Sequence, residues 1–345
     1  MKSARWRRGP GHRGFRTSLL IVVGLMMAVP IAGATGILTP NAGRGAATLT
    51  PQVASGTTCV VGSSPEFDAY DPVDHDVYVP NFGSGNLSVL TGACKLVGTV
   101  TFPKGSEPFA AAFNPTNNRV YVTDYGRAKV YVISGTKLVD TISSTTFAEP
   151  VGVTFDPGDA VIAVANLGSD TVTFLSGTIV AFTTTVGIGP ELMAYDPYFG
   201  RLLVANTGTA NVTSLNAIYP SDEADNINIP VGDCPVGIAF DYATSADYVT
   251  NQNSNNVTVI TGIGQQLASI PVGSEPHQIA WDQAKLSVYV ANLGSSTVSV
   301  IQGYTVVKTL GVSPSTAHFN GITYDEATDQ VLVTAFGTGE VYVYS

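Results

Sequence analysis

One pattern occurs seven times in this chain and constrains its fold more than any other feature of the sequence. Each copy contains a segment related to Tyr248-Val-Thr-Asn251, and successive copies begin 40 to 45 residues apart. A second marker, an Asp or Asn directly after an aromatic residue, repeats with the same six intervals. Two markers in one register indicate an internal repeat. The second marker falls at Asp71, Asn114, Asp156, Asp196, Asp241, Asp282 and Asp325.

Each copy predicts four short antiparallel strands. A small residue precedes the aromatic residue, as the two faces of a strand require, and the marker Asp or Asn then begins a turn. A Gly or Asn, which tolerates positive φ, follows the second strand and predicts a hairpin. A unit of about 42 residues is the size of a propeller blade, whereas helical repeats need a 3.6-residue periodicity that is absent. We therefore predict an all-β, seven-bladed β-propeller over residues 57–345.

The seventh copy ends at Ser345, after its third strand. The segment Thr57–Gly62 carries the fourth-strand pattern of Ala268–Gly273 and precedes the first copy. We predict that this N-terminal segment completes the last blade, because closure removes the exposed strand edges on which sheets aggregate.

The motif resembles that of the YVTN-type β-propellers, a family common among archaeal surface-layer and other secreted proteins. The resemblance covers roughly residues 57–345 and is clearest at Tyr78-Val-Pro-Asn81, Tyr121-Val-Thr-Asp124 and Tyr248-Val-Thr-Asn251. The seventh copy departs from the pattern, since Ala335 stands in place of the Asn. The resemblance implies an extracellular role in surface layers, adhesion or ligand binding, and by itself it implies no chemistry.

The first 34 residues have the layout of a secretory signal peptide. Six of the sixteen Lys and Arg residues lie among the first sixteen positions, and an apolar run from Ser18 ends in Ala32-Gly33-Ala34. An uncleaved membrane anchor is the alternative, because the apolar run is just long enough to span a bilayer. We expect a mature chain from about Thr35, a flexible linker over residues 35–56, and an extracellular or cell-surface location.

The net charge excludes one class of partner. After residue 34 the chain carries 10 basic and 26 acidic residues, a formal charge of −16. Such a chain repels nucleic acid and anionic lipid headgroups. We therefore expect no nucleic-acid partner, and membrane contact only through an uncleaved N-terminal segment. A cell-envelope protein or glycan remains open as a partner.

The sequence contains no motif of a known catalytic apparatus, so we name no catalytic residue. Side chains of the types that bind metal ions recur at two positions of the repeat. One position lies seven residues before the marker, where the chain enters the innermost strand of each blade. The other lies two residues further along the chain. They are either solvated turn residues held too far apart to converge, or a site for a small molecule or divalent cation at one mouth of the central channel. No other cofactor is expected. The candidate ligand-binding residues are Glu107, Glu149, Glu191, Glu275, His277 and His318.

Two further kinds of covalent chemistry are open to an exported chain. A disulfide between Cys59 and Cys94 would link the last blade to the first and leave Cys234 unpaired. The alternative is three partly buried thiols. Three Asn-x-Ser/Thr sequons are candidate glycosylation sites, although Asn-Val-Thr is also good turn-then-strand chemistry. They begin at Asn86, Asn211 and Asn256.

These observations lead to two functional hypotheses. The first is a non-enzymatic extracellular propeller that acts as a binding, adhesive or surface-layer-associated module. The alternative is a propeller enzyme, lactonase-like or lyase-like, with its site at one mouth of the channel. An enzyme would gather several titratable groups in one pocket, whereas a binding module would leave them pointing separately to solvent.

Overall fold

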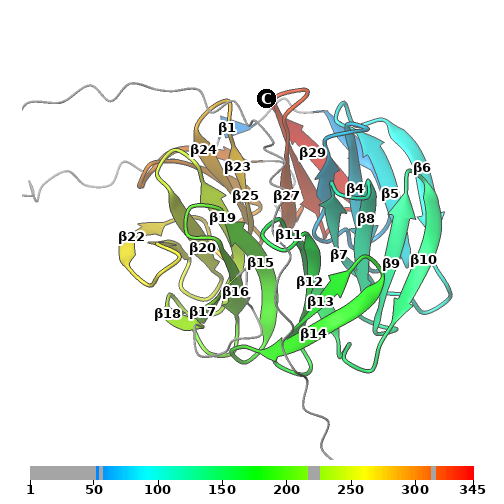
Figure 1. The fold of residues 1–345 in the computed structure, drawn as a ribbon. Helices are drawn as coiled ribbons and strands as arrows, with labels where there is room; N and C mark the ends of the chain where they lie inside the picture. The colour runs from blue at the N-terminus through cyan, green and yellow to red at the C-terminus, as the bar shows by residue number, and fades with distance from the viewer. Residues whose placement is uncertain (1–51, 54–56, 217–225, 312–315) are drawn as a thin grey trace, which may run out of the picture. The chain divides into compact units, whose positions relative to one another are not determined.

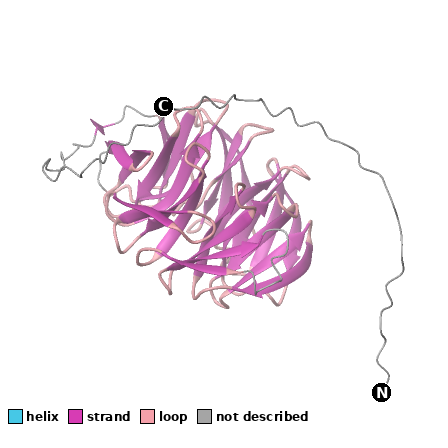
Figure 2. Cartoon of the chain, turned by 60° about the vertical axis from the view of Figure 1, so that its left-hand side comes forward, coloured by secondary structure: helices cyan, strands magenta, loops and turns pink. Residues whose placement is uncertain are grey.

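The computed structural model describes residues 52–53, 57–216, 226–311 and 316–345, all within the compact unit Thr48–Ser345. All of its described elements are β-strands joined by turns (Figure 1, Figure 2). These residues include no helix that could cross a membrane. The predicted leader, and the predicted linker apart from β1 (Gln52–Val53), lie outside them.

The strands form seven antiparallel sheets, the blades, and each chain segment runs from the innermost strand outward. Blades 1 and 2 contain β3 (Ala69–Asp71), β4 (Asp76–Asn81), β5 (Asn86–Thr91), β6 (Leu96–Thr101), β7 (Pro108–Asn114), β8 (Arg119–Asp124), β9 (Lys129–Ser134) and β10 (Lys137–Ser143). Blades 3 and 4 contain β11 (Pro150–Asp156), β12 (Val161–Asn166), β13 (Thr171–Ser176), β14 (Ile179–Thr185), β15 (Pro190–Asp196), β16 (Arg201–Asn206), β17 (Asn211–Asn216) and β18 (Ile227–Pro230).

The remaining three blades complete the ring. Blades 5 and 6 contain β19 (Pro235–Asp241), β20 (Ala246–Asn251), β21 (Asn256–Ile260), β22 (Gln266–Pro271), β23 (Pro276–Asp282), β24 (Ser287–Asn292), β25 (Thr297–Gln302) and β26 (Thr305–Gly311). Blade 7 contains β27 (Phe319–Asp325), β28 (Gln330–Ala335), β29 (Glu340–Tyr344) and β2 (Thr58–Val60). Strand β1 adds to blade 6 by pairing parallel with β26.

The ring closes as the sequence predicts. Strand β2 pairs antiparallel with β29, so three C-terminal strands and one N-terminal strand form the last blade. Each innermost strand contacts that of the next blade, and β27 contacts β3. The seven-bladed all-β propeller is therefore confirmed. A disulfide joins Cys59 of β2 to Cys94, in the turn between β5 and β6, with their Cα atoms 5.6 Å apart.

The repeat markers have the structural roles that their chemistry predicts. Each marker carboxyl or amide oxygen accepts a backbone hydrogen bond from the following turn, as Asp241 does from Ala243 at 2.7 Å. The Asn251 side chain donates to Asn256 Oδ1 at 2.8 Å and to Thr258 Oγ1 at 2.8 Å. Asn86 and Asn211 accept the same bond in their blades. The sequon asparagines thus have a structural role, and their glycosylation stays a prediction.

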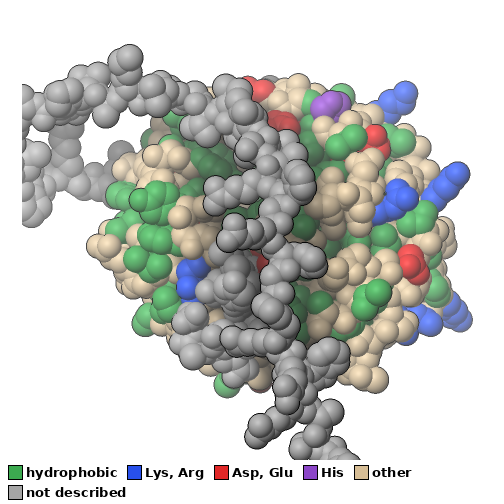
Figure 3. Space-filling model, in the orientation of Figure 1, with side chains coloured by type: hydrophobic (Ala, Val, Ile, Leu, Met, Phe, Trp, Pro, Cys, Tyr) green, Lys and Arg blue, Asp and Glu red, His purple; other side chains and the backbone are tan. Residues whose placement is uncertain are grey.

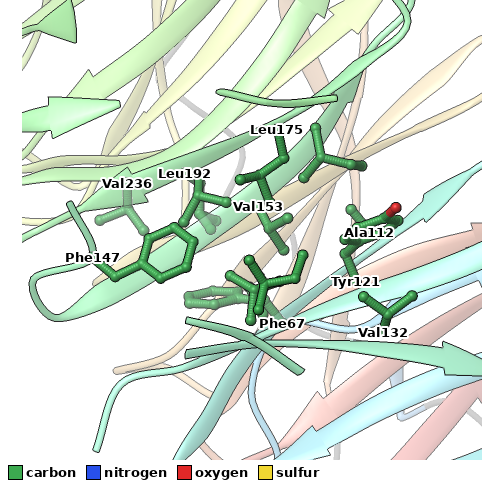
Figure 4. Packing of buried hydrophobic residues seen from close by; sticks show 14 residues of the cluster. Phe67, Ala112, Tyr121, Val132, Phe147, Val153, Leu175, Leu192 and Val236 are labelled. Carbon is green, nitrogen blue, oxygen red and sulfur yellow. The ribbon is translucent and has the colours of Figure 1, made fainter. Parts of the chain in front are cut away.

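The core lies between the blades and around the axis. The motif tyrosines Tyr78, Tyr121 and Tyr248 are fully buried between neighbouring sheets. Near the axis, Phe67 of blade 1 belongs to a cluster with Leu192 and Val236 from blades 4 and 5 (Figure 4). The side chain of Phe67 is 1% exposed, so the channel is packed at this level.

Candidate functional site

The candidate site is built on one position of the repeat, five residues before the marker. In blades 2 to 7 the strand pairing shifts here, as between Pro276 and Ile279, and such a bulge changes the direction of the side chains. Interactions among these side chains cross from blade to blade, which places them around the channel. The seven residues are Glu66, Phe109, Val151, Glu191, Val236, His277 and Asn320.

Blades 1 to 5 surround a pocket of about 440 Å³ at this mouth of the channel. Three residues of the position just described line it, together with residues that directly follow the motif Asn or Asp in blades 1 to 4. The lining is mostly apolar, which is typical of small-molecule sites. It consists of Phe82, Phe109, Tyr125, Val151, Leu167, Glu191, Thr207 and Cys234.

Three aromatic rings form one side of this pocket, which we call the aromatic wall: Phe82, Phe109 and Tyr125. The ring centroid of Phe82 lies 6.3 Å from that of Phe109 and 6.2 Å from that of Tyr125. Phe109 and Tyr125 are 6.5 Å apart. All three rings are half-buried, so each packs on its neighbours and still presents surface to the pocket.

Glu191 is the carboxyl in the pocket lining. It is half-buried, and removal from water raises its pKa from 4.5 to about 7. The Cys234 thiol lines the same pocket and donates to Gln252 Oε1 at 3.4 Å. Burial raises the pKa of Cys234, and the charges of Glu191 and Asp233 raise it further, so this thiol is neutral at pH 7.

A second polar group lies on the opposite arc of the channel, on blades 6, 7 and 1. Asn320 Nδ2 donates a hydrogen bond to Glu66 Oε2 across the seam between the last and first blades. Burial raises the pKa of Glu66 to about 8. The charge of Glu191 adds to this rise, and the hydrogen bond from Asn320 opposes it. His277 stacks on Phe67 with ring centroids 5.3 Å apart, and burial lowers its pKa to about 4, although Asn320 opposes the shift.

The repeat motif itself holds two of these residues in place. The Thr334 hydroxyl, from the Thr of the seventh motif, donates to the Glu66 carbonyl of the next blade at 3.0 Å. The Thr250 hydroxyl donates in the same way to the carbonyl of His277. Each hydroxyl also accepts from the innermost strand of its own blade, Thr334 from the Gly321 amide at 2.7 Å. Each motif threonine therefore fixes the channel residue of the following blade.

Asp68 departs most from the repeat. The other six residues at this position are apolar, whereas Asp68 is 4% exposed and neither carboxylate oxygen has a hydrogen-bond partner among the described residues. Burial raises its pKa from 3.8 to about 8. A Cβ atom added at Gly321 would lie only 2.9 Å from Asp68 Oδ1. A residue with a side chain would therefore clash here, so the seam needs Gly321.

The structure places the predicted ligand-binding residues in two groups. Glu191 and His277 lie at the channel, at the position described above. The other four turn back over glycines of their own blades, and Glu149, Glu275 and His318 are exposed. Among the residues that the structure describes, no group of three His, Cys, Asp or Glu could hold a metal ion. The four residues that the structure does not bring together are Glu107, Glu149, Glu275 and His318.

The four separated residues share one position of the repeat, and its backbone is unusual. The residue seven positions before the marker has positive φ in most blades, as at Glu149 (50°), Glu275 (51°) and His318 (52°). Positive φ alone does not set the direction of the side chain, because Cys234 has φ 56° at the same repeat position and lines the mouth pocket. Sequence patterns did not predict Glu66, Asp68 and Asn320 as site residues. For Asp68 the available signal was a polar residue at a repeat position that is apolar in the other six blades.

Comparisons with known proteins show what the chain is similar to. No family model matches it, and no curated protein matches it. Among solved structures, the virginiamycin B lyase from Staphylococcus aureus superposes with a TM-score of 0.73 and 12% identity, covering 84% of this chain and 99% of that one. A streptogramin B lyase gives a TM-score of 0.72 and 14% identity, covering 83% of this chain and 94% of that one.

A third structure extends the same observation. It is a catalytically inactive variant of the S. aureus virginiamycin B lyase with quinupristin, at a TM-score of 0.72 and 12% identity, covering 84% of this chain and 98% of that one. Identities this low show the fold alone. Our first functional hypothesis, the non-enzymatic adhesive module, is nevertheless corrected, because these similar propellers are lyases. The comparisons support the enzyme that was our alternative.

Proposed function

We propose that this chain is a lyase-like propeller enzyme whose active site is the mouth pocket, with Glu191 as its proton acceptor. One observation carries the proposal: a half-buried carboxyl with a pKa of about 7 lies in a largely apolar pocket at the mouth of the channel. A general base works best when its pKa lies near the working pH. The likeness to lyase propellers supports this reading of the pocket.

The proposed reaction is an elimination. The Glu191 carboxylate removes a proton from carbon, the C–H electron pair becomes a new double bond, and the bond to the leaving group breaks. The leaving group departs with its bonding electrons and takes up a proton. The neutral Cys234 thiol lies in the same lining, and its single S–H, which Gln252 Oε1 accepts in this structure, would have to turn to the departing atom to stabilise negative charge there. The aromatic wall holds the apolar part of the substrate.

Turnover of defined substrates tests the proposal. The first compounds to assay are virginiamycin B, after which the similar lyases are named, and quinupristin, which is present in one of the similar structures. Products are separated by chromatography and identified by mass spectrometry. We expect Glu191→Gln to lose activity by at least about 100-fold. The matched control is Glu149→Gln, an exposed carboxyl outside the pocket, which should keep full activity.

Isotope-labelled water separates the two enzyme classes. A lyase forms its product without taking oxygen from water, whereas a lactonase incorporates one labelled oxygen atom. Turnover that survives Glu191→Gln would overturn the assignment of the base. Labelled product would show that the enzyme is a hydrolase and not a lyase.

We also propose that the chain is exported and belongs with the YVTN-type repeat propellers. The seven motif copies and the N-terminal layout support this proposal, and the cross-blade disulfide is typical of an oxidising compartment. N-terminal sequencing of secreted protein should find a start near Thr35, and recovery of Lys2 or Ser3 would favour the anchor instead.

A further inference from the structure

The mouth pocket has two unlike sides. On one side is the aromatic wall of Phe82, Phe109 and Tyr125, and on another is the Glu191 carboxyl. Among the described residues that line it, none is Lys, Arg or His. From this arrangement we infer that the substrate carries a positively charged amine or quaternary ammonium group, which binds between the aromatic wall and Glu191. The inference rests on the proposed function, since it names the substrate class of the same pocket.

The aromatic wall attracts cations. The face of an aromatic ring is negative, and a cation within about 6 Å of a ring centroid is attracted to it. Three rings that touch one another at 6.2 to 6.5 Å offer a larger surface of this kind than a single ring. Alkyl groups on the nitrogen would also bury apolar surface against Val151 and Leu167.

The charges around Glu191 favour the same ligand. The titratable groups that interact with it are the Glu66 carboxyl and the Cys234 thiol, and neither can compensate a negative charge. The basic side chains visible on the face in Figure 3 lie mostly over blades 1 and 2, at the edge of the molecule. An anionic ligand would be repelled, and a neutral ligand would leave the carboxylate unpaired in an apolar pocket.

Binding of a cation should therefore release a proton. With a pKa near 7, about nine-tenths of Glu191 is protonated at pH 6 in the free protein. A positive charge a few ångströms away favours the carboxylate and lowers this pKa. The substrate would thus generate the ionised base that its own elimination requires.

Calorimetry with a matched pair of probes tests the inference on the full chain. The cation is benzyltrimethylammonium, and the neutral control of similar shape is dimethylbenzylcarbinol. We expect the cation to bind at least about tenfold more tightly at pH 8, because cation–π contact and the carboxylate both act on it. At pH 6, titrations in buffers of different ionisation enthalpy should show release of close to one proton per cation bound.

Two variants locate the effect. Glu191→Gln should abolish both the proton release and the preference for the cation, and the matched control Glu275→Gln, on the rim of blade 6, should change neither. Equal affinities for the two probes, or a preference for the cation that survives Glu191→Gln, would overturn the inference. Failure here is distinct from failure of the proposed function, because turnover that depends on Glu191 could persist for a neutral substrate.

Discussion

The disulfide between Cys59 and Cys94 should supply most of the stability of ring closure. Strand β2 is only three residues long, and two of them are exposed, so its pairing with β29 buries little apolar surface. The disulfide joins cysteines 35 positions apart. For a loop of this length, the restriction of the unfolded chain predicts a contribution of about 4 kcal/mol. The double substitution Cys59→Ser with Cys94→Ser should lower the free energy of unfolding by this amount.

Urea unfolding followed by fluorescence measures the change, with and without reductant. Reductant should destabilise the wild-type protein as much as the double substitution does, and it should leave the double variant unchanged. The control is Cys234→Ser, because this thiol is unpaired and its loss should not alter the response to reductant. A loss below about 1 kcal/mol would show that β2 closes the ring without the covalent link, and would refute the argument.

Three further predictions concern single residues. If Glu191 is the base, log kcat/KM should rise with pH and level off above about pH 7, where the carboxylate is the main form; a profile that is flat from pH 5 to 8 would contradict this. Asp68 has a raised pKa of about 8 in the folded protein, so it binds a proton there that the unfolded chain has already lost, and its contribution to stability falls as pH rises from about 4 to 8. Asp68→Asn should therefore be more stable than wild type by at least about 1 kcal/mol at pH 8, with the gain shrinking toward pH 4 in thermal scans. Gly152→Ala should be destabilised by about 2 kcal/mol or more, because its Cβ would lie 1.9 Å from the Glu191 carbonyl oxygen, and equal melting temperatures would show that the strands can separate.

The fold could be predicted from the sequence because it depends on features that recur in every copy. The marker turns, the buried motif tyrosines and the hairpins each have a local physical cause, and seven repetitions remove the ambiguity of any one. The fourth-strand pattern at Thr57–Gly62 likewise identified the closing strand. Strand β1 was not predicted, since a two-residue parallel pairing leaves no periodic signal.

The site could be predicted only in part, because a repeat register does not reveal where a side chain points. Glu191 and His277 lie at the channel, whereas Glu149 two positions earlier in the repeat has positive φ and is exposed. That conformation depends on how each outer strand returns to the axis, which is a property of the ring. Sequence spacing alone gave both positions equal weight.

The positions of the missed residues at the seam of the ring show why they belong to the site. Glu66 and Asp68 lie where blade 1 begins, and Asn320 lies where blade 7 begins, 254 residues from its partner Glu66. A buried hydrogen bond between the two ends of the ring can form only after closure, so this side of the channel depends on the same seam that the disulfide holds. Natural sequences depart from a local pattern mainly where function requires it. The polar seam and the mouth pocket are therefore linked electrostatically, because the charge of Glu191 helps to raise the pKa of Glu66.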